Sequence, residues 1–221
     1  MESDDAIGEV SPPRALLPLA VFPPMQWFEA AQVPGSQVCV HEHYVKQSLR
    51  NRLALSGPQG GFDHVLPVHR RGAESRGIQD IRFTERVNPR QLMKVLQTNY
   101  GKAPYFLHIA PEIEAWSQAH LVPGGTLMTA ALSSTEWACQ WLDCPHPPTT
   151  TQYHPSAALD LRPKSAWPSP GGHPYPQAFA DRHGFVGGRS ILDVLFHLGP
   201  EASSLPSHHG YNDLAPDAPS P

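Results

Sequence analysis

Prolines divide this chain into short segments and mark where its elements can begin. The 221 residues include 26 prolines, well above the share of about 5% that is usual in proteins. Proline suits the first turn of a helix, because the amide N–H that it lacks would have no partner there. Pro24, Pro89 and Pro104 therefore predict the starts of three helices, and many of the other prolines fall in connections or near the C-terminus.

Apolar segments between the prolines predict the other elements. Short apolar runs bounded by turn residues predict strands, at residues 16–22, 38–40, 51–55, 62–68 and 78–83. Residues 57–61, which hold three glycines, predict a hairpin turn. Helical spacing predicts helices, at residues 24–34, 89–100, 104–120, 125–142, 176–183 and 190–198. Asn88 and Ser190 are the expected N-caps of the helices that follow them, and residues 162–176, rich in proline and glycine, predict a loop. We expect one α/β domain over residues 15–202, with a mixed sheet of about five strands flanked by helices, and disordered tails at residues 1–14 and 203–221.

Charge and composition indicate a cytoplasmic protein that binds a small molecule. The acidic start Met-Glu-Ser-Asp-Asp differs from a secretory signal, and no window holds the roughly 18–20 apolar residues that span a membrane. The net charge is −4, with 12 Lys and Arg against 10 acidic residues in residues 1–102 and 4 against 10 in residues 103–221. This excess is too small and scattered for a nucleic-acid surface. It predicts a local anion site in the N-terminal half, with no nucleic-acid partner.

Residues 41–52, His-Glu-His-Tyr-Val-Lys-Gln-Ser-Leu-Arg-Asn-Arg, concentrate polar groups directly after the apolar residues 38–40. Such a concentration at a strand end costs folding free energy unless a ligand or an internal network satisfies it. The stretch therefore predicts a small-molecule site with an anionic component. In this interpretation the cations Lys46, Arg50 and Arg52 hold the anion. The carboxamides of Gln47 and Asn51 orient the acceptor, and Tyr44 lines the pocket with Tyr175. The alternative is a solvated loop tethered by Asn51 and surface ion pairs.

His41 is the predicted general base, because an imidazole titrates near neutral pH. Glu42 would orient it or serve as the base itself. His41 and His43 also have a spacing that suits a metal ion, which would need further ligands. A hydrogen-bonded histidine near a strand end is the third interpretation.

The three cysteines, Cys39, Cys139 and Cys144, have no metal-type pairing and predict reduced thiols. Cys39 shares a strand face with His41, which would suit acyl transfer through a thioester, but its valine neighbours favour a buried, inert thiol. In the C-terminal part we expect Tyr175 and Gln177 to close over the ligand. Asp193, inside an apolar helix, would pair with Arg50 or Arg52. The glycines at 187 and 188, before a capped helix, suit an anion or a plain turn.

Several segments, in the same succession along the chain, resemble the WbqC-like protein family. Residues 22–28, Phe-Pro-Pro-Met-Gln-Trp-Phe, are similar to its opening aromatic turn, and residues 44–52, Tyr-Val-Lys-Gln-Ser-Leu-Arg-Asn-Arg, to its motif of Tyr, Lys-Gln and Arg-Asn-Arg. Residues 99–106, which include Tyr105, are similar to its Pro-aromatic-aromatic element, and further similarity extends to residue 202. The resemblance implies a step of surface-glycan (O-antigen type) metabolism.

We therefore expect an enzyme that transfers an acyl or aminoacyl group to a sugar-linked amine or hydroxyl. Its substrate would be an anionic or sugar-linked small molecule, and an acyl carrier is a candidate partner. Lys46, Arg50 and Arg52 would bind the anion, with Tyr105 among the substrate-binding residues. No cofactor is expected. The alternatives are a non-catalytic binding or assembly protein and a metal-assisted hydrolase that uses His41 and His43.

Overall fold

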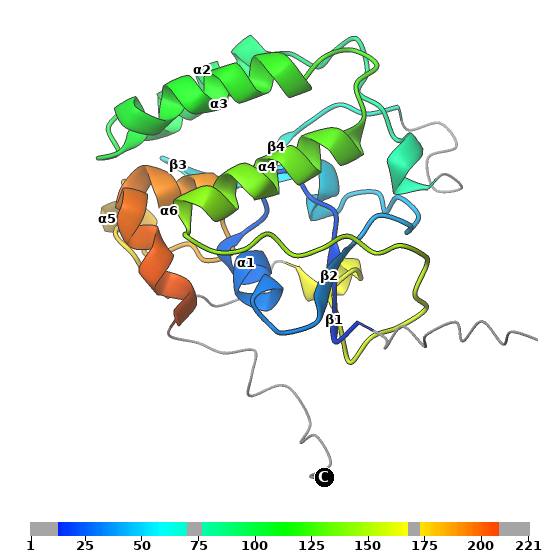
Figure 1. Ribbon diagram of the computed structural model, residues 1–221. Helices are drawn as coiled ribbons and strands as arrows, with labels where there is room; N and C mark the ends of the chain where they lie inside the picture. The colour runs from blue at the N-terminus through cyan, green and yellow to red at the C-terminus, as the bar shows by residue number, and fades with distance from the viewer. Residues whose placement is uncertain (1–12, 70–76, 168–172, 208–221) are drawn as a thin grey trace, which may run out of the picture.

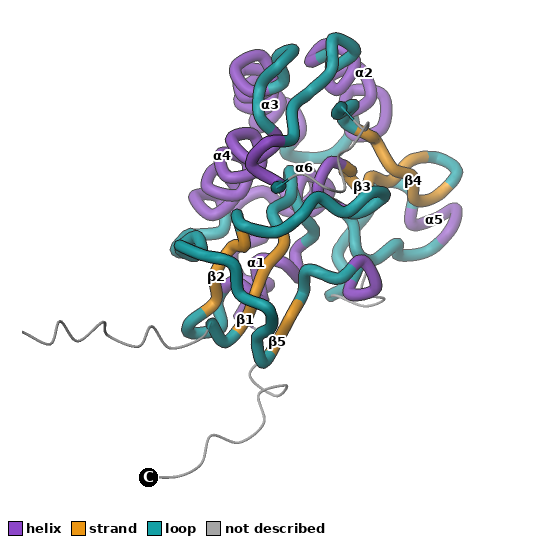
Figure 2. The backbone as a smooth tube through the Cα atoms, turned by 90° about the vertical axis from the view of Figure 1, so that its right-hand side faces the viewer, coloured by secondary structure: helices purple, strands orange, loops and turns teal. Residues whose placement is uncertain are grey.

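The strands form two separate small sheets in the computed structural model, which describes residues 13–69, 77–167 and 173–207. The first sheet is parallel, with β1 (Ala15–Pro18) between β2 (Ser36–Cys39) and β5 (Leu159–Asp160). The second is an antiparallel hairpin of β3 (Arg52–Gly57) and β4 (Gly60–Val65). Figure 2 shows β2, β1 and β5 side by side, with the hairpin apart from them. The α/β class is confirmed, whereas the expected single sheet of five strands is wrong.

Residues 78–83 explain part of this difference. The alternation of Ile78, Ile81 and Phe83 with polar residues predicted a strand, but the segment begins as a 3₁₀ helix, η3 (Ile78–Asp80). Ile78 and Ile81 are both buried, and a spacing of three residues places two side chains on the same face of a 3₁₀ turn. β5 escaped prediction because it has only two residues.

The hairpin and the longer helices follow the sequence signals. The loop between β3 and β4 has two residues, and Gly60 has a φ of +100°, which glycine adopts without steric cost. α2 (Pro89–Tyr100) begins after Asn88, whose side chain accepts a hydrogen bond of 3.3 Å from the Gln91 amide. The other helices are α1 (Met25–Ala31), α3 (Phe106–His120), α4 (Leu127–Trp141), α5 (Ala180–His183) and α6 (Ile191–Leu198). The 3₁₀ helices are η1 (Leu49–Asn51), η3, η4 (Lys164–Ala166) and η5 (Gly199–Ser207).

The core lies between the parallel sheet and the helices. α6 is buried along almost its whole length, and the large side chains of Trp27, Phe106 and Phe196 are fully enclosed. α3 contacts α2, α4 and α6, and Figure 1 shows the α2–α3 pair on the far side of α4 from the parallel sheet. The helices thus do not cover the carboxyl ends of the parallel strands. Loops and the hairpin lie there.

The predicted tails fall mostly outside the described residues, which leave out 1–12 and 208–221. Within the described part of the second tail, residues 203–207 continue η5. Among the helices of the described ranges, none has the length and apolar character that crossing a membrane requires.

Candidate functional site

A cavity of about 390 Å³ lies among the segments that follow the three parallel strands. Phe22 follows β1, Gln47 follows β2 and Trp167 follows β5, and all three side chains line it. In open α/β sheets ligands bind outside the carboxyl ends of the strands, and small-molecule sites have volumes of about 300–1,000 Å³. Both the position and the volume of this cavity therefore suit a small-molecule site.

The hairpin and the start of α6 form the opposite wall. The hairpin supplies Arg52, Ala54 and Asp63, and the residues before α6 supply Gly188, Arg189 and Ser190. Ser190 joins the two walls, because its amide donates to the Ala54 carbonyl at 2.7 Å and its Oγ donates to the Phe22 carbonyl at 2.8 Å. The same Oγ accepts from the Leu192 amide and caps α6, as its sequence position predicted.

Among the described side chains that line the cavity, cations outnumber acids, with Arg52, Lys164 and Arg189 against the one carboxylate of Asp63. Arg52 Nη1 lies 3.0 Å from Asp63 Oδ2 at the surface. Lys164 Nζ lies 3.5 Å from Gln47 Oε1, and this contact links the segments after β5 and β2. This charge balance favours an anionic ligand.

Arg189 and Trp167 are held in fixed orientations. Arg189 Nη1 donates to the Leu55 carbonyl at 3.2 Å, and its Nε donates to the Gly187 carbonyl at 3.1 Å. A Cβ at Gly61 would lie 2.5 Å from Arg189 Nη1, so a larger residue there would displace the guanidinium from this position. Trp167 Nε1 donates to the Leu161 carbonyl at 2.7 Å. The cavity thus has a pre-oriented indole ring and a pre-oriented cation.

Two lining residues have a left-handed backbone. Phe22 has a φ of +44° and Gln47 a φ of +55°, and such a conformation costs a non-glycine residue about 1–2 kcal/mol. Hydrogen bonds of its amide to Ser134 Oγ and of its carbonyl to Ser190 Oγ hold Phe22 in place. Strained residues cluster at functional sites, so their presence in one cavity supports its assignment as the site.

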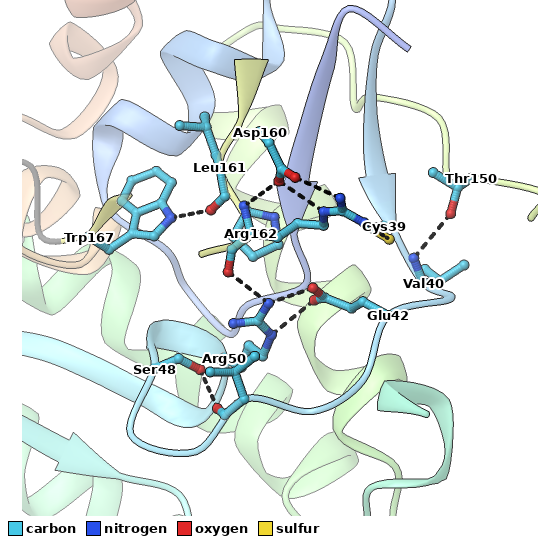
Figure 3. Close-up of polar contacts among 12 residues, drawn as sticks. Cys39, Val40, Glu42, Ser48, Arg50, Thr150, Asp160, Leu161, Arg162 and Trp167 are labelled. Carbon is cyan, nitrogen blue, oxygen red and sulfur yellow. Dashed lines mark hydrogen bonds and ion pairs between the residues drawn. The ribbon is translucent and has the colours of Figure 1, made fainter. Parts of the chain in front are cut away.

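Glu42 and Arg50 form a buried ion pair beside the cavity. Arg50 Nε donates to Glu42 Oε1 at 2.9 Å and Nη2 donates to Oε2 at 2.5 Å, while Nη2 also reaches the Arg162 carbonyl at 3.1 Å. Burial raises the pKa of Glu42 above its ordinary value, although the Arg50 guanidinium opposes this shift. Figure 3 shows Arg50 between Glu42 and Arg162. Neither Glu42 nor Arg50 lines the cavity, and their pair fixes the loop that follows β2.

Arg162 extends this network to β5 and β2. Its Nε and Nη2 contact the two oxygens of Asp160 at 2.9 and 2.6 Å, and its Nη1 lies 3.9 Å from Cys39 Sγ (Figure 3). Burial alone would raise the pKa of Asp160, but the hydrogen bonds from Arg162 hold it below its ordinary value. Cys39 is fully buried, as its valine neighbours suggested.

The predicted binding stretch divides into inward and outward residues. Tyr44 and Asn51 are buried: the Tyr44 hydroxyl donates to Asn51 Oδ1 at 2.9 Å, and Asn51 Nδ2 donates to the Leu66 carbonyl at 2.7 Å. Together with Lys46, they line a neighbouring cavity of about 70 Å³. Gln47 and Arg52 line both cavities. The structure therefore brings Gln47 and Arg52 to the main cavity and Tyr44, Lys46 and Asn51 next to it.

Asp193 has other partners than those expected. Its buried carboxylate accepts from the Tyr100 hydroxyl at 2.7 Å, the Tyr175 hydroxyl at 2.7 Å and Gln177 Nε2 at 3.1 Å. The predicted pairing with an arginine of the 41–52 stretch is therefore wrong. Burial alone would raise the pKa of Asp193, but the neighbouring His197, and next the hydrogen bonds from the two tyrosines, hold it below its ordinary value.

The other predicted residues lie away from the main cavity. Tyr175 and Gln177 serve the Asp193 network and do not line that cavity, and the Tyr105 ring packs against Gly199. His41 and His43 are exposed and do not line it either. Within residues 13–69, 77–167 and 173–207, no group of three or more His, Cys, Asp or Glu side chains could hold a metal ion. The His41–His43 pair thus gains no third ligand from the described residues.

Several cavity residues were not predicted from the sequence as binding residues, among them Asp63, Lys164, Trp167 and Arg189. Arg189 had a signal, because it follows the glycines at 187 and 188 that were considered for anion binding. Lys164 and Trp167 fall in a segment rich in proline, which predicted only a loop. Asp63 lies in a segment that was predicted as a strand, and from the sequence it looked like an ordinary outward-facing residue of that strand.

The chain belongs to the WbqC-like protein family, whose family model matches residues 20–165. The matched range contains Phe22, Gln47, Arg52 and Lys164, and it ends before Trp167 and the start of α6. No curated protein matches the chain, and no solved structure matches it either. Family membership and the cavity are therefore the two findings on which a function can be proposed.

Proposed function

We propose that this WbqC-like protein binds a small anionic, sugar-linked molecule in the 390 Å³ cavity and transfers an acyl or aminoacyl group to its amine or hydroxyl. The observation that carries this proposal is the set of three cations and an indole around a cavity at the carboxyl ends of the parallel strands. The protein would act in the cytoplasm, in surface-glycan metabolism, with an acyl carrier as a candidate donor.

The lining side chains suit separate parts of such a ligand. Lys164 and Arg189 supply positive charge for a phosphate or carboxylate, and the Arg189 fork is matched to bidentate binding. The Trp167 ring offers an apolar face to a sugar ring, while the Gln47 carboxamide can hydrogen-bond to hydroxyls. The cavity is open, so a larger donor can approach a ligand bound there.

The transfer step requires a proton acceptor near the attacked amine or hydroxyl. His41 and Glu42, the predicted catalytic residues, do not line the cavity. We assign the acceptor to the Asp63 carboxylate, the acidic group among the lining residues. Arg52, at 3.0 Å, would hold this carboxylate in its orientation.

A second candidate function is binding without catalysis, as in a small-molecule-binding or assembly protein. The specific observation in its favour is that the cavity is separate from His41 and Glu42, while Asp63 is tied to Arg52. In this alternative the same ligand binds and no group is transferred.

A thermal-shift experiment tests the binding step. The probes are UDP-glucosamine, glucosamine 1-phosphate, free glucosamine and inorganic pyrophosphate. We expect the two phosphorylated amino sugars to raise Tm, and free glucosamine to leave it unchanged. The shift should be lost in Lys164→Ala and kept in Lys94→Ala, which removes an exposed lysine of α2 outside the cavity. Absence of any shift with all four probes would contradict the proposal.

A turnover experiment separates the two candidates. The protein is incubated with UDP-glucosamine and acyl thioesters, and the acylated sugar is detected by mass spectrometry. Transfer predicts product with the wild type and none with Asp63→Asn, although this variant still binds UDP-glucosamine. Binding without product, across thioesters of different chain lengths, would favour the non-catalytic alternative.

A further inference from the structure

The C-terminal end of α4 brings two cysteines together. α4 ends at Trp141, Leu142 follows it, and Asp143 has a left-handed φ of +49°. The Cys144 amide donates to the Cys139 carbonyl at 3.1 Å, and the Asp143 amide donates to the Gln140 carbonyl at 3.4 Å. These two bonds are those of the Schellman motif, which satisfies the last carbonyls of a helix. Aspartate tolerates the left-handed position better than most residues.

A Schellman motif places the side chains at its two ends in contact. Here those side chains are Cys139 and Cys144, and both line the same cavity. Cys139 Sγ also lies 3.9 Å from the Pro145 carbonyl. The backbone that ends the helix therefore holds two thiols against each other.

The pair is accessible from one side. Both cysteines line an open cavity of about 490 Å³, together with Glu136, Gln140 and His146. Cys139 is buried and Cys144 is half-buried. This cavity shares no lining residue with the anion cavity, so a reagent can reach the thiols without entering the site proposed for substrate.

We propose that Cys139 and Cys144 form a reactive dithiol that a small-molecule disulfide such as oxidised glutathione converts reversibly into an intramolecular disulfide. The Cys144 thiolate attacks one sulfur of the glutathione disulfide, so that a protein–glutathione bond forms and one glutathione thiolate leaves. Cys139 then loses its proton and attacks Cys144, and the second glutathione thiolate leaves. Two protein thiols are oxidised, one glutathione disulfide is reduced, and two glutathione thiols result.

The environment of each thiol fits its role in this sequence. The neighbouring Cys139 thiol lowers the pKa of Cys144 in spite of its burial, and Gln32 acts in the same direction. The nearby Cys144, together with burial, raises the pKa of Cys139. Because the thiolate is the nucleophile, Cys144 attacks first and Cys139 resolves.

Mass spectrometry on the full chain tests this proposal. The chain has three cysteines, so the folded protein is incubated with oxidised glutathione, quenched with acid, unfolded, and its thiols are counted. We expect a mass lower by two hydrogens, one remaining thiol, and full recovery with dithiothreitol. Cys39→Ser should still lose two hydrogens, because Cys39 takes no part. Cys139→Ser should instead keep a glutathione adduct on Cys144, because no resolving thiol is left.

Three results would overturn the proposal. They are an unchanged mass, a wild-type glutathione adduct that persists, or a disulfide that includes Cys39. Circular dichroism of each variant shows that it is folded, and the wild-type mass result decides the matter even where a variant does not fold. None of these outcomes depends on the proposed substrate.

Discussion

Glu42 and Arg50 face each other across the loop after β2, with both carboxylate oxygens paired to the guanidinium at 2.9 and 2.5 Å. The Arg50 side chain is 1% exposed and that of Glu42 is 6% exposed. The pair therefore anchors the segment that carries Gln47 and Arg52 to the cavity. Two residues that the sequence suggested for chemistry thus hold other residues of the site in position.

Arg50→Ala should destabilise the fold strongly. Removal of one partner of a buried ion pair leaves the other charge uncompensated and costs about 3–5 kcal/mol. Arg52→Ala is the matched control, because Arg52 is paired at the surface with Asp63 and should cost at most about 1 kcal/mol. Urea unfolding measures both variants. An Arg50→Ala variant as stable as Arg52→Ala would contradict the anchoring role.

The double variant Glu42→Leu with Arg50→Met should be more stable than either single variant. An apolar pair of similar volume leaves no unpaired charge, and such replacements of buried ion pairs are often neutral or stabilising. A double-mutant cycle in urea yields the interaction energy. Additive losses from the two substitutions would show that the charges are not coupled in the folded protein.

Asp193 should make the free energy of unfolding decrease as the pH falls below about 4. Its folded-state pKa is lowered, so its contribution is complete above the unfolded-state pKa of about 4 and is lost as the pH falls through the lower folded-state value. Glu42 acts in the opposite direction, because its pKa is raised in the folded protein. Asp193→Asn should lose about 2–3 kcal/mol at pH 7, since one oxygen is replaced by a donor facing other donors.

Urea unfolding from pH 7 to pH 3 checks this prediction. The Asp193→Asn substitution should flatten the acid limb of the profile relative to the wild type. Tyr175→Phe, which removes one of the donors to Asp193, should cost only about 1 kcal/mol and keep most of the acid limb. An Asp193→Asn profile parallel to that of the wild type would exclude Asp193 as the titrating group.

Gln47→Gly should separate stability from binding. Glycine removes the left-handed strain, which should raise the free energy of unfolding by about 1–2 kcal/mol. It also gives the unfolded chain more conformational freedom, which should lower the free energy of unfolding by about 0.5–1 kcal/mol. The net change in the free energy of unfolding should stay within about 1 kcal/mol, while binding of UDP-glucosamine weakens because the carboxamide beside Lys164 is absent. Gln47→Val is the control for conformation, since a β-branched residue is unfavourable at positive φ. Equal stability of the valine and glycine variants would argue against strain.

The sequence predicted those elements whose signals are local. The Asn88 cap, the Ser190 cap and the glycine-rich hairpin turn all depend on residues within a few positions, and all three are confirmed. The strand prediction for residues 78–83 was wrong because only Ile81 and Phe83 have the two-residue spacing of a strand face, whereas Ile78 and Ile81, three residues apart, share a face of a 3₁₀ turn. The split into two sheets could not be predicted, because strand pairing depends on how distant segments pack.

The candidate site shows the same limit. The stretch 41–52 was identified from its polar groups, but which of them point inward depends on partners elsewhere in the chain. Arg50 is engaged by Glu42 and by the distant Arg162 carbonyl, and Asn51 by Leu66. Lys164 and Trp167 reach the cavity only because β5 pairs with β1, and a two-residue strand leaves almost no sequence signal.

The central claim is that the cavity beyond the parallel strands binds an anionic ligand, and Lys164 tests it most directly because its side chain is exposed. Isothermal titration calorimetry with UDP-glucosamine should give a Kd about tenfold higher for Lys164→Ala than for the wild type, equal to about 1.4 kcal/mol. Lys94→Ala should bind like the wild type. Equal Kd values for the wild type and both variants would contradict the claim.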